Sequence, residues 1–283
     1  MRYGLWLALF ACACAGAAPD CADEGELTVT FLANEGFLLR AAGNGVLIDA
    51  FVVERHAEYG ALSGEMAAAL RTASPPFDTV RVALASHVHR DHFQPGPARE
   101  FLSASPATRL ASAPQVLEAL RDAHVENAAL AERLEDVLPA PGRSTRFEVP
   151  GVKVEVLRLS HGREARVDNL GHVIDIGSWR IVHVGDAEPY ADTYAPYALA
   201  ERDIDVSLIP YWYFQSDDGL HIVARHLRAP HMIAAHIPPD EVEAVRDALA
   251  GTLPEVVVPV APGQSWCLNR RTGHDRVTGL PGA

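Results

Sequence analysis

The chain has 283 residues, which is enough for one large domain or two small ones. Its 48% hydrophobic and 22% charged residues are typical of a globular protein that can bury a sizeable core. With 37 acidic against 24 basic residues the formal net charge is -13, which argues against nucleic-acid binding because that function usually needs a basic face.

The N-terminus has the pattern of an export signal. Arg2 precedes a short apolar stretch, and small residues follow, so cleavage is expected after Ala15 or Ala17. The apolar stretch is too short to form a stable membrane-spanning helix. We therefore expect a signal peptide at residues 1–18, a mature domain at residues 24–283 and a secreted or periplasmic protein; a buried N-terminal strand or helix is the alternative.

The four cysteines lie near the two ends of the chain. Cys12 and Cys14 would leave with the signal, unless one of them is the acylated cysteine of a lipoprotein. Cys21 and Cys267 would remain in the mature protein. Because exported proteins commonly oxidise their cysteines, we predict a Cys21–Cys267 disulfide, with two free thiols as the alternative.

Apolar and β-branched runs separated by turn residues predict several short strands in the first half of the chain. The run at residues 80–85 is almost wholly apolar, as expected of a strand that is covered on both faces. Strands are expected at residues 27–32, 36–40, 45–49 and 80–85, and helices at residues 57–70, 97–102 and 115–138.

The second half repeats this style, with strands ahead of helices. Strands are expected at residues 152–159, 171–176, 179–184, 206–209, 232–235, 256–260 and 265–268, and helices at residues 220–227 and 240–249. Strands that cluster before helices in each half favour two sheets packed face to face with helices outside, a four-layer αββα sandwich. A doubly wound parallel sheet is the alternative, which the short spacing of the first strands disfavours.

A dense group of potential metal ligands follows the strand at residues 80–85. Within six positions the chain places His87, His89, Asp91 and His92. Histidine is the commonest metal ligand and is otherwise scattered thinly through proteins. A polar surface loop that happens to be rich in histidine is the alternative, but the apolar strand before it disfavours that reading.

Three further potential ligands each close an apolar strand. These residues are His161, Asp186 and His236. Any one of them alone is weak evidence, because a single histidine at the end of a strand is usually a surface or hydrogen-bonded residue. Side chains at the ends of different strands can converge at one edge of a sheet, so the ordered set predicts a metal site.

These motifs resemble those of the metallo-β-lactamase superfamily. The similarity rests on the His-x-His-x-Asp-His run at residues 87–92, followed by Ser160-His161-Gly162, Gly185-Asp186 and Ala235-His236, and preceded by the run that ends at Asp49. It covers nearly the whole mature chain and implies an α/β fold of the αββα type. Asn169 to Gly171 is loosely similar to the ascorbate-lactonase and N-acyl-phosphatidylethanolamine phospholipase D branches.

The resemblance implies two Zn2+ ions, with iron or manganese as alternatives. His87, His89 and His161 would hold one ion, Asp91, His92 and His236 the other, and Asp186 would bridge both. Asp91 and Asp186 are therefore the candidate catalytic residues. The two metals would share a hydroxide that attacks the substrate.

Asp49 is a candidate to orient a ligand imidazole by accepting its other N–H, with a turn residue at the end of a strand as the alternative. His183 and His231 precede proposed ligands by odd separations, so strand alternation predicts that they face the opposite way and are structural. No metal role is expected for the other histidines, although His56 and His221 could reach a substrate pocket. Those other histidines are His56, His124, His172, His221, His226 and His274.

Four consecutive aromatic residues follow the strand at residues 206–209. Tyr211, Trp212, Tyr213 and Phe214 could line an apolar substrate pocket close to the metals. Buried packing beneath the sandwich is the alternative.

The sequence as a whole predicts an exported, zinc-dependent hydrolase that cleaves an ester, lactone, amide or phosphoester of a small molecule. Asp186 at the bridging position favours a general hydrolase over an antibiotic-hydrolysing enzyme. A di-iron oxidoreductase of the same fold is one alternative, although such members typically have Glu at the position of His89 and a flavin domain for which this chain has no room. A non-catalytic metal-binding member is the other, and a nuclease is disfavoured by the acidic charge.

Overall fold

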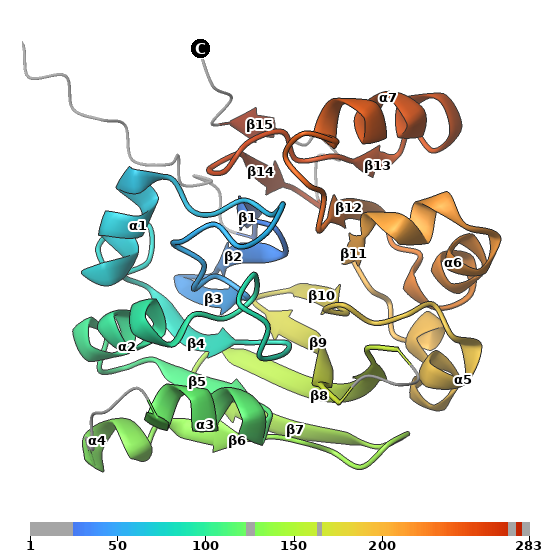
Figure 1. The fold of residues 1–283 in the computed structure, drawn as a ribbon. Helices are drawn as coiled ribbons and strands as arrows, with labels where there is room; N and C mark the ends of the chain where they lie inside the picture. The colour runs from blue at the N-terminus through green and yellow to red at the C-terminus, as the bar shows by residue number, and fades with distance from the viewer. Residues whose placement is uncertain (1–24, 123–127, 163–165, 271–275, 279–283) are drawn as a thin grey trace, which may run out of the picture.

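The computed structural model describes residues 25–122, 128–162, 166–270 and 276–278, in which two β-sheets lie face to face between helices (Figure 1). One sheet has eight strands in the order β15 (Arg276–Thr278), β14 (Ser265–Leu268), β1 (Leu27–Ala33), β2 (Gly36–Ala41), β3 (Asn44–Ile48), β4 (Val80–Leu84), β5 (Arg109–Ser112) and β6 (Leu134–Asp136). The other has seven, in the order β13 (Val256–Val257), β12 (His231–Ala235), β11 (Val206–Pro210), β10 (Trp179–His183), β9 (Asp168–Ile176), β8 (Val152–Ser160) and β7 (Ser144–Val149).

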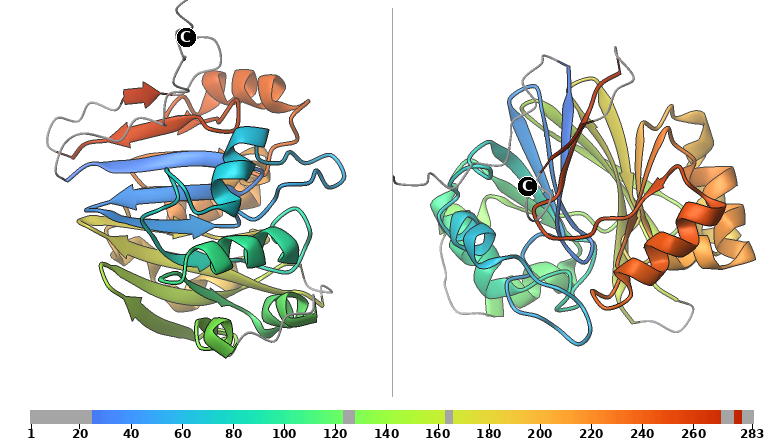
Figure 2. Two further views of the ribbon diagram at one scale, coloured as in Figure 1. Left: turned by 90° about the vertical axis from the view of Figure 1, so that its left-hand side faces the viewer. Right: turned by 90° about the horizontal axis from the view of Figure 1, so that it is seen from above.

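Helices cover the outer face of each sheet (Figure 2). On the eight-stranded sheet lie α1 (Gly64–Arg71), α2 (Pro95–Ala104), α3 (Pro114–Asp122) and the single turn α4 (Ala128–Ala131). On the seven-stranded sheet lie α5 (Ala191–Tyr194), α6 (Asp217–Ile222) and α7 (Val242–Thr252), with the 3-10 turns η1 (Ala195–Tyr197), η2 (Leu199–Glu201) and η3 (Tyr211–Gln215) and the π-helical turn η4 (Val223–Leu227). The predicted four-layer αββα sandwich is confirmed.

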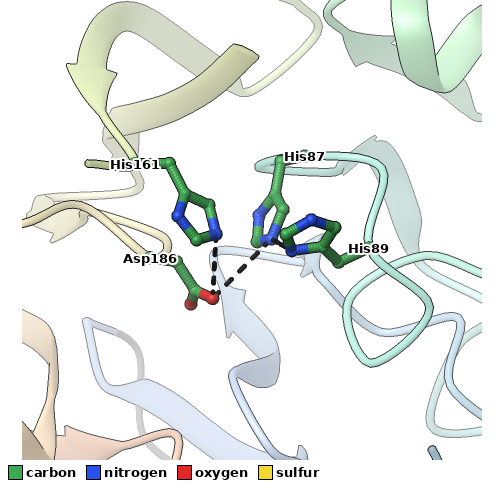
Figure 3. A group of neighbouring side chains, drawn as sticks. All are labelled: His87, His89, His161 and Asp186. Atoms are coloured by element: carbon green, nitrogen blue, oxygen red, sulfur yellow. Dashed lines mark hydrogen bonds and ion pairs between the residues drawn. The ribbon is translucent and has the colours of Figure 1, made fainter. Parts of the chain in front are cut away.

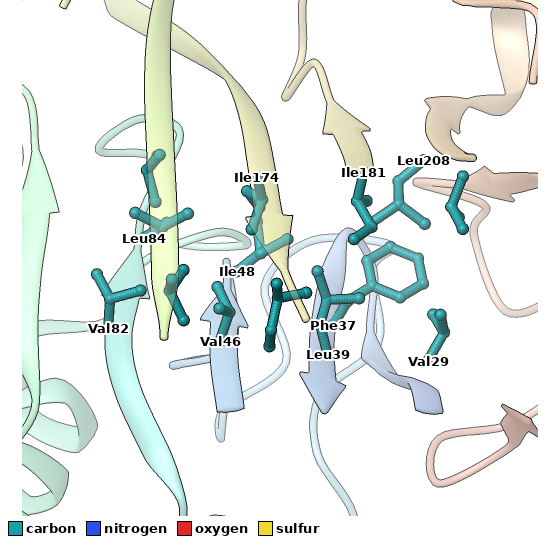
Figure 4. Packing of buried hydrophobic residues seen from close by; sticks show 14 of the residues in the cluster. Val29, Phe37, Leu39, Val46, Ile48, Val82, Leu84, Ile174, Ile181 and Leu208 are labelled. Atoms are coloured by element: carbon teal, nitrogen blue, oxygen red, sulfur yellow. The ribbon is translucent and has the colours of Figure 1, made fainter. Parts of the chain in front are cut away.

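Three hydrophobic clusters hold the layers together. The central cluster fills the space between the sheets with side chains such as Ile48, Leu84, Ile174 and Ile181 (Figure 4). The two outer clusters pack the helices onto their sheets. Since burying an aliphatic side chain of this size contributes about 1.5–3 kcal/mol, these clusters are the main source of stability.

Strand direction gathers the candidate ligands at one edge of the sandwich. β3 and β4 run parallel, as do β10, β11 and β12. β8 is antiparallel to β9, which is antiparallel to β10, so β8 points the same way as β10. A residue of the predicted site follows within three positions of the carboxyl end of each of five strands, which are β3, β4, β8, β10 and β12.

Two of the predicted helices are wrong over part of their length. Residues 57–63 are not helical: the chain doubles back so that Leu62 N–H donates to Val52 O at 2.9 Å, and α1 begins only after Ser63, whose hydroxyl caps Met66 N–H. The predicted helix at 115–138 is confirmed at α3 and again at the single turn α4. Its last third is wrong, because residues 134–136 form β6 and pair with β5 instead of continuing a helix.

Other boundaries differ because single-residue effects override the local pattern. The predicted strand at 256–260 ends at Val257, two residues before Pro259, which cannot donate to a ladder. The helix predicted at 220–227 begins earlier, at Asp217 after the capping Ser216, and changes to a π-helical turn from Val223. β5 and β7 were not predicted, since β5 has only four residues and β7 is a largely exposed edge strand.

The ends of the chain are only partly described. The predicted signal peptide, Cys12, Cys14 and Cys21 lie outside the described residues, and so do His124 and His274. Cys267 is buried in β14 and is disulfide-bonded, but its predicted pairing with Cys21 stays a prediction. Within the described segments we find no helix with the length and apolar character needed to cross a bilayer.

A fully buried histidine makes the stability of the fold sensitive to acid. His172 on β9 has no exposed surface, and its ring stacks on His183 of β10 at a centroid distance of 6.0 Å. Burial, and then the neighbouring His183 charge, lower the pKa of His172 from 6.5 to about 3. Between pH 6.5 and about pH 3 the unfolded chain therefore binds a proton at His172 that the folded chain does not bind. The free energy of unfolding decreases as pH falls through this range.

We expect His172→Leu to flatten this dependence in the metal-free protein. One proton of difference changes the free energy of unfolding by about 1.4 kcal/mol per pH unit, so the natural protein should lose up to about 2 kcal/mol more than the variant between pH 6.5 and about pH 5. Urea unfolding at each pH measures this difference. The exposed His221→Leu control should keep the original slope; equal slopes for the natural protein and His172→Leu would contradict the prediction.

Candidate metal centre

The seven predicted ligands converge at the carboxyl edge of the two sheets. The His-rich run at residues 87–92 follows β4, and His161, Asp186 and His236 follow β8, β10 and β12. Their donor atoms fall into two groups, each of which could hold a cation. We refer to His87, His89 and His161 as the first donor group, and to Asp91, His92 and His236 as the second donor group.

The first donor group brings three imidazoles against one carboxylate oxygen (Figure 3). His87 is fully buried, His161 is half-buried and His89 is exposed, so the group reaches from the interior to the surface. His87 Nε2 lies 3.0 Å from His89 Nδ1. Asp186 Oδ2 lies 3.7 Å from His87 Nε2 and 3.4 Å from His161 Nε2.

The second donor group is more deeply buried. His92 Nε2 lies 3.1 Å from His236 Nε2, and Asp91 Oδ2 lies 3.4 Å from both of these nitrogens. Asp186 Oδ1 is 3.2 Å from each of the same two nitrogens. One oxygen of Asp186 thus faces each donor group, which is the placement that a bridging carboxylate requires.

The side chains present fit a pair of metal cations. Nitrogen atoms of different imidazoles approach within 3.0 and 3.1 Å, and lone pairs at that distance repel unless a proton or a cation lies between them. Asp186 Oδ1 and His161 Nε2 are buried yet make no well-aligned hydrogen bond. Imidazole nitrogens with carboxylate oxygens suit zinc, and also iron or manganese. Metal binding by these residues stays a prediction.

A hydrogen-bond network beneath the ligands fixes which imidazole nitrogen is free. Asp49 Oδ2 lies 2.8 Å from His92 Nδ1, so this nitrogen donates its proton to the carboxylate and Nε2 is the nitrogen that would face a metal. Ser86 donates from its hydroxyl to Asp49 Oδ2 at 2.6 Å and from its N–H to Oδ1 at 2.7 Å. The Ser86 oxygen is then left to accept from His87 Nδ1 at 2.9 Å. Asp49 lies where its predicted orienting role requires.

Burial and the nearby carboxylate of Asp186 have opposite effects on the pKa values of the buried imidazoles. Burial and then the charge of His92 hold the pKa of His87 well below its usual range. Burial would also lower the pKa of His92 and His236, but the carboxylate of Asp186 beside them outweighs it, raising the pKa of His236 to about 9 and that of His92 well above its usual value. Burial alone would raise the pKa of Asp49, yet the hydrogen bond and charge of His92 lower it to about 2.

A tight turn brings Asp186 between the two groups. β10 ends at His183, and Gly185 then adopts a φ of +55°, which an L side chain rarely tolerates. The Asn169 side chain fastens this turn, because its Oδ1 accepts Asp186 N–H at 3.1 Å and its Nδ2 donates to Val184 O at 3.1 Å. The sequence does not predict this role of Asn169.

An open hollow of about 460 Å3 gives access to the centre. Tyr59, which was not predicted as a site residue, stands with its ring centroid 4.3 Å from that of His236. Burial, and then the nearby carboxylates of Glu58 and Asp91, raise the pKa of Tyr59 to about 12, so the phenol keeps its proton. The lining residues are His56, Ala57, Tyr59, Val88, His89, Arg90, Asp91, Asp186 and His236.

The aromatic cluster divides between this site and the core. Trp212 packs on His236 at a centroid distance of 5.1 Å, and Tyr211 packs on Trp212, so these two border the centre. The substrate-pocket prediction is wrong for Tyr213 and Phe214, because both are buried in the cluster under the helices. Tyr213 instead donates to Ala187 O at 2.6 Å, which supports the residue after Asp186.

The remaining histidines lie outside the two donor groups. His221 is exposed on α6, and His56 borders the hollow. His231 packs near Trp179 at the start of β12. Strand alternation does not fix the direction of His183 relative to Asp186, because β10 ends at His183. His183 is fully buried beneath the centre, and its Nε2 lies 3.3 Å from Glu35 Oε2.

Comparison with known proteins identifies the class to which this fold and site belong. Residues 28–236 match the family model described as beta-lactamase superfamily domain, so the chain belongs to that superfamily. Its fold is shared with solved structures that are described as metal-dependent hydrolases, and its His/Asp cluster could bind metal ions. No curated protein matches the chain.

Solved structures share the fold at low sequence identity. A possible metal-dependent hydrolase from Veillonella parvula has a TM-score of 0.61 and 15% identity, covering 85% of this chain and 99% of that one. An isothiocyanate hydrolase from Delia radicum gut bacteria has a TM-score of 0.58 and 15% identity, covering 84% and 98%. CmlA, a diiron beta-hydroxylase from Streptomyces venezuelae, has a TM-score of 0.52 and 13% identity, covering 92% of this chain and 55% of that one.

We expect Gly185→Ala to disturb the centre as well as the fold. A Cβ there would lie 2.4 Å from Asn169 Oδ1 and 2.7 Å from Ser86 Cβ, in a backbone conformation that strains any L side chain. The cost in unfolding free energy should be about 1–3 kcal/mol, and displacement of Asp186 should weaken metal binding. Urea unfolding and competition with a chromophoric chelator measure the two effects.

Gly177→Ala is the matched control for this variant. Gly177 also has a positive φ of +58°, but it lies in the β9–β10 turn at the far end of the strand from Asp186, where its nearest neighbour would be Ala41 Cβ at 3.3 Å. Gly177→Ala should lower the free energy of unfolding without lowering the affinity for metal. Equal metal affinities for the two variants would refute the argument about the Asp186 turn.

Proposed function

We propose that the protein is an exported hydrolase that uses two zinc ions to cleave an ester, lactone, amide or phosphoester bond in a small molecule. The observation that carries this proposal is the position of Asp186, which presents one oxygen to each donor group. The family membership supports a metal-dependent hydrolase, and the N-terminal sequence supports export. Bound divalent cations supply Lewis acidity that polarises a substrate oxygen and acidifies water.

The chain's own residues supply orientation. The first donor group would hold one cation, the second donor group the other, and Asp186 would serve both. Asp91 borders the hollow with 7% of its surface exposed. Burial alone would raise the pKa of Asp91, but the hydrogen bonds and charges of His236 and His92 hold it well below its usual range, so the ionised carboxylate can orient the attacking water by accepting a hydrogen bond from it. Tyr59 and Trp212 flank His236 and would contact the part of the substrate that lies over the second donor group.

A di-iron oxidation is the second candidate, because the similar CmlA structure is described as a diiron beta-hydroxylase. That similarity concerns the fold alone. The donor set of this chain contains five histidines and two aspartates, and such nitrogen-rich sites suit zinc as well as iron.

Metal analysis of the purified protein, together with hydrolysis of chromogenic esters, lactones, phosphodiesters and a cephalosporin, tests the proposal. We expect close to two zinc ions per chain and turnover of at least one substrate class that a chelator abolishes. Iron instead of zinc, with no hydrolysis, would favour the oxidative reading. A protein that takes up no metal when zinc is offered would overturn both readings.

We expect Asp186→Asn and His89→Ala to lower turnover at least about 100-fold, beyond the losses usual for residues that only support a ligand. Both side chains line the hollow and lie outside the hydrophobic clusters, so the fold should persist, as circular dichroism can verify. The control is His221→Ala, which removes an exposed histidine of α6 and should retain full activity. Undiminished turnover in both site variants would exclude the proposed centre.

A further inference from the structure

The turn between β1 and β2 reaches the floor of the metal centre, although the sequence shows it only as a short connection. Asn34 Nδ2 donates to Asp91 at two atoms, the backbone O at 3.1 Å and Oδ2 at 3.2 Å. Asn34 O accepts the backbone N–H of His236 at 3.0 Å. One residue of this turn therefore fixes two members of the second donor group.

The next residue, Glu35, is a buried carboxylate with 1% of its surface exposed. Neither of its oxygens has a hydrogen-bond partner among the described residues, and its ionic neighbour is His183, whose Nε2 lies 3.3 Å from Oε2. Burying a charge is costly unless an opposite charge compensates for it. A carboxylate retained at such a position needs a reason beyond packing.

His183 lies between Glu35 and the network that orients His92. Its Nε2 is 3.3 Å from Glu35 Oε2 and 3.9 Å from Asp49 Oδ2, and that same Asp49 oxygen lies 2.8 Å from His92 Nδ1. Glu35 also lies close to the ligands themselves, since donor atoms of Glu35, His92 and Asp186 fall within 4.8 Å of one another. No ion pair joins Glu35 to the first donor group in the described residues.

Two carboxylates thus compete for His183, and this competition acts together with the two hydrogen bonds from Ser86 on the direction of Asp49. With Glu35 present, His183 has a nearer anionic partner, and Asp49 Oδ2 is left to accept from His92. Without the Glu35 charge, His183 would draw Asp49 away from His92, because Asp49 would be its remaining anionic neighbour. His92 would then lose the hydrogen bond that keeps its Nε2 lone pair free for a metal.

We propose that Glu35 is a positioning residue of the metal site formed by the second donor group, acting on His92 through His183 and Asp49. The Asn34 half of the same turn holds Asp91 and His236, so two adjacent residues organise the whole group. This inference rests on the proposed function only in requiring that the donor groups bind metal. It concerns affinity at one of two sites and is independent of the bond that the enzyme cleaves.

The test is titration of the purified full chain with Co2+, read from its visible absorption, in backgrounds that isolate each group. His89→Ala leaves the second donor group intact, and His236→Ala leaves the first. In the His89→Ala background we expect Glu35→Gln to lower Co2+ affinity about 10–100-fold, the range typical of residues that orient a ligand. In the His236→Ala background it should leave affinity unchanged.

A rescue separates positioning from structural damage. Adding His183→Gln to Glu35→Gln removes the competitor for Asp49, so the affinity of the second donor group should recover at least in part. The matched control Glu155→Gln alters another buried glutamate, which pairs with Arg146 and Arg202 away from the site, and should not change Co2+ affinity. Urea unfolding of the metal-free variants should show no loss of stability in Glu35→Gln that accounts for the effect.

Each contrary result has its own meaning. Loss of a whole equivalent of Co2+ in Glu35→Gln, without recovery in the double variant, would overturn positioning and make Glu35 a ligand. Equal weakening in both backgrounds would make it a structural residue. Unchanged affinity in a chain that still binds two ions would refute this inference alone, whereas a natural protein that binds no metal would overturn the proposed function as well.

Discussion

The structure of this site depends on one carboxylate that faces two ways. Asp186 places one oxygen 3.2 Å from two histidines of the second donor group and the other 3.4 Å from His161 of the first. Such a residue must stand between strands from both sheets, which is why β10 ends in a glycine turn and why Asn169 holds that turn from both sides. The repulsion between closely spaced imidazoles would be relieved by bound cations, which is what makes the assembly a candidate metal site.

The sandwich makes this convergence possible at little cost to its own stability. The residues of the central cluster are all aliphatic or aromatic, and the polar network begins only where the strands end. Below the ligands, Asp49, Ser86, Glu35 and His183 form a layer of buried polar groups between the metal donors and the hydrophobic interior. His87 and His92 thus each have a hydrogen-bond partner at Nδ1, on the side away from the Nε2 that would face a metal, which fixes the direction of the ring.

The convergence of the candidate ligands could be predicted because these residues are contiguous or close an apolar strand. Four candidates fall at residues 87–92, and the other three follow strands whose apolar runs are easily identified, so the sequence predicts all seven together. The residues that support them could not be predicted in this way. Glu35 stands between two apolar strands where a polar residue normally marks a turn, and only the fold shows that its side chain points inward. The loop that carries Tyr59 was read as helix, because its return onto Val52 depends on a contact distant in sequence.

The asymmetry between the two donor groups follows from these supports. The first group ends at the exposed His89 and is supported from below mainly by the hydroxyl of Ser86. The second group is held by Asn34, Asp49 and, through His183, Glu35, and it is flanked by Tyr59 and Trp212. A site that is rigid and charge-compensated binds a cation more tightly than one that must hold an exposed imidazole in place. If both groups hold a cation as proposed, the second group should therefore bind it more tightly, even though Asp91 and His236 also line the hollow.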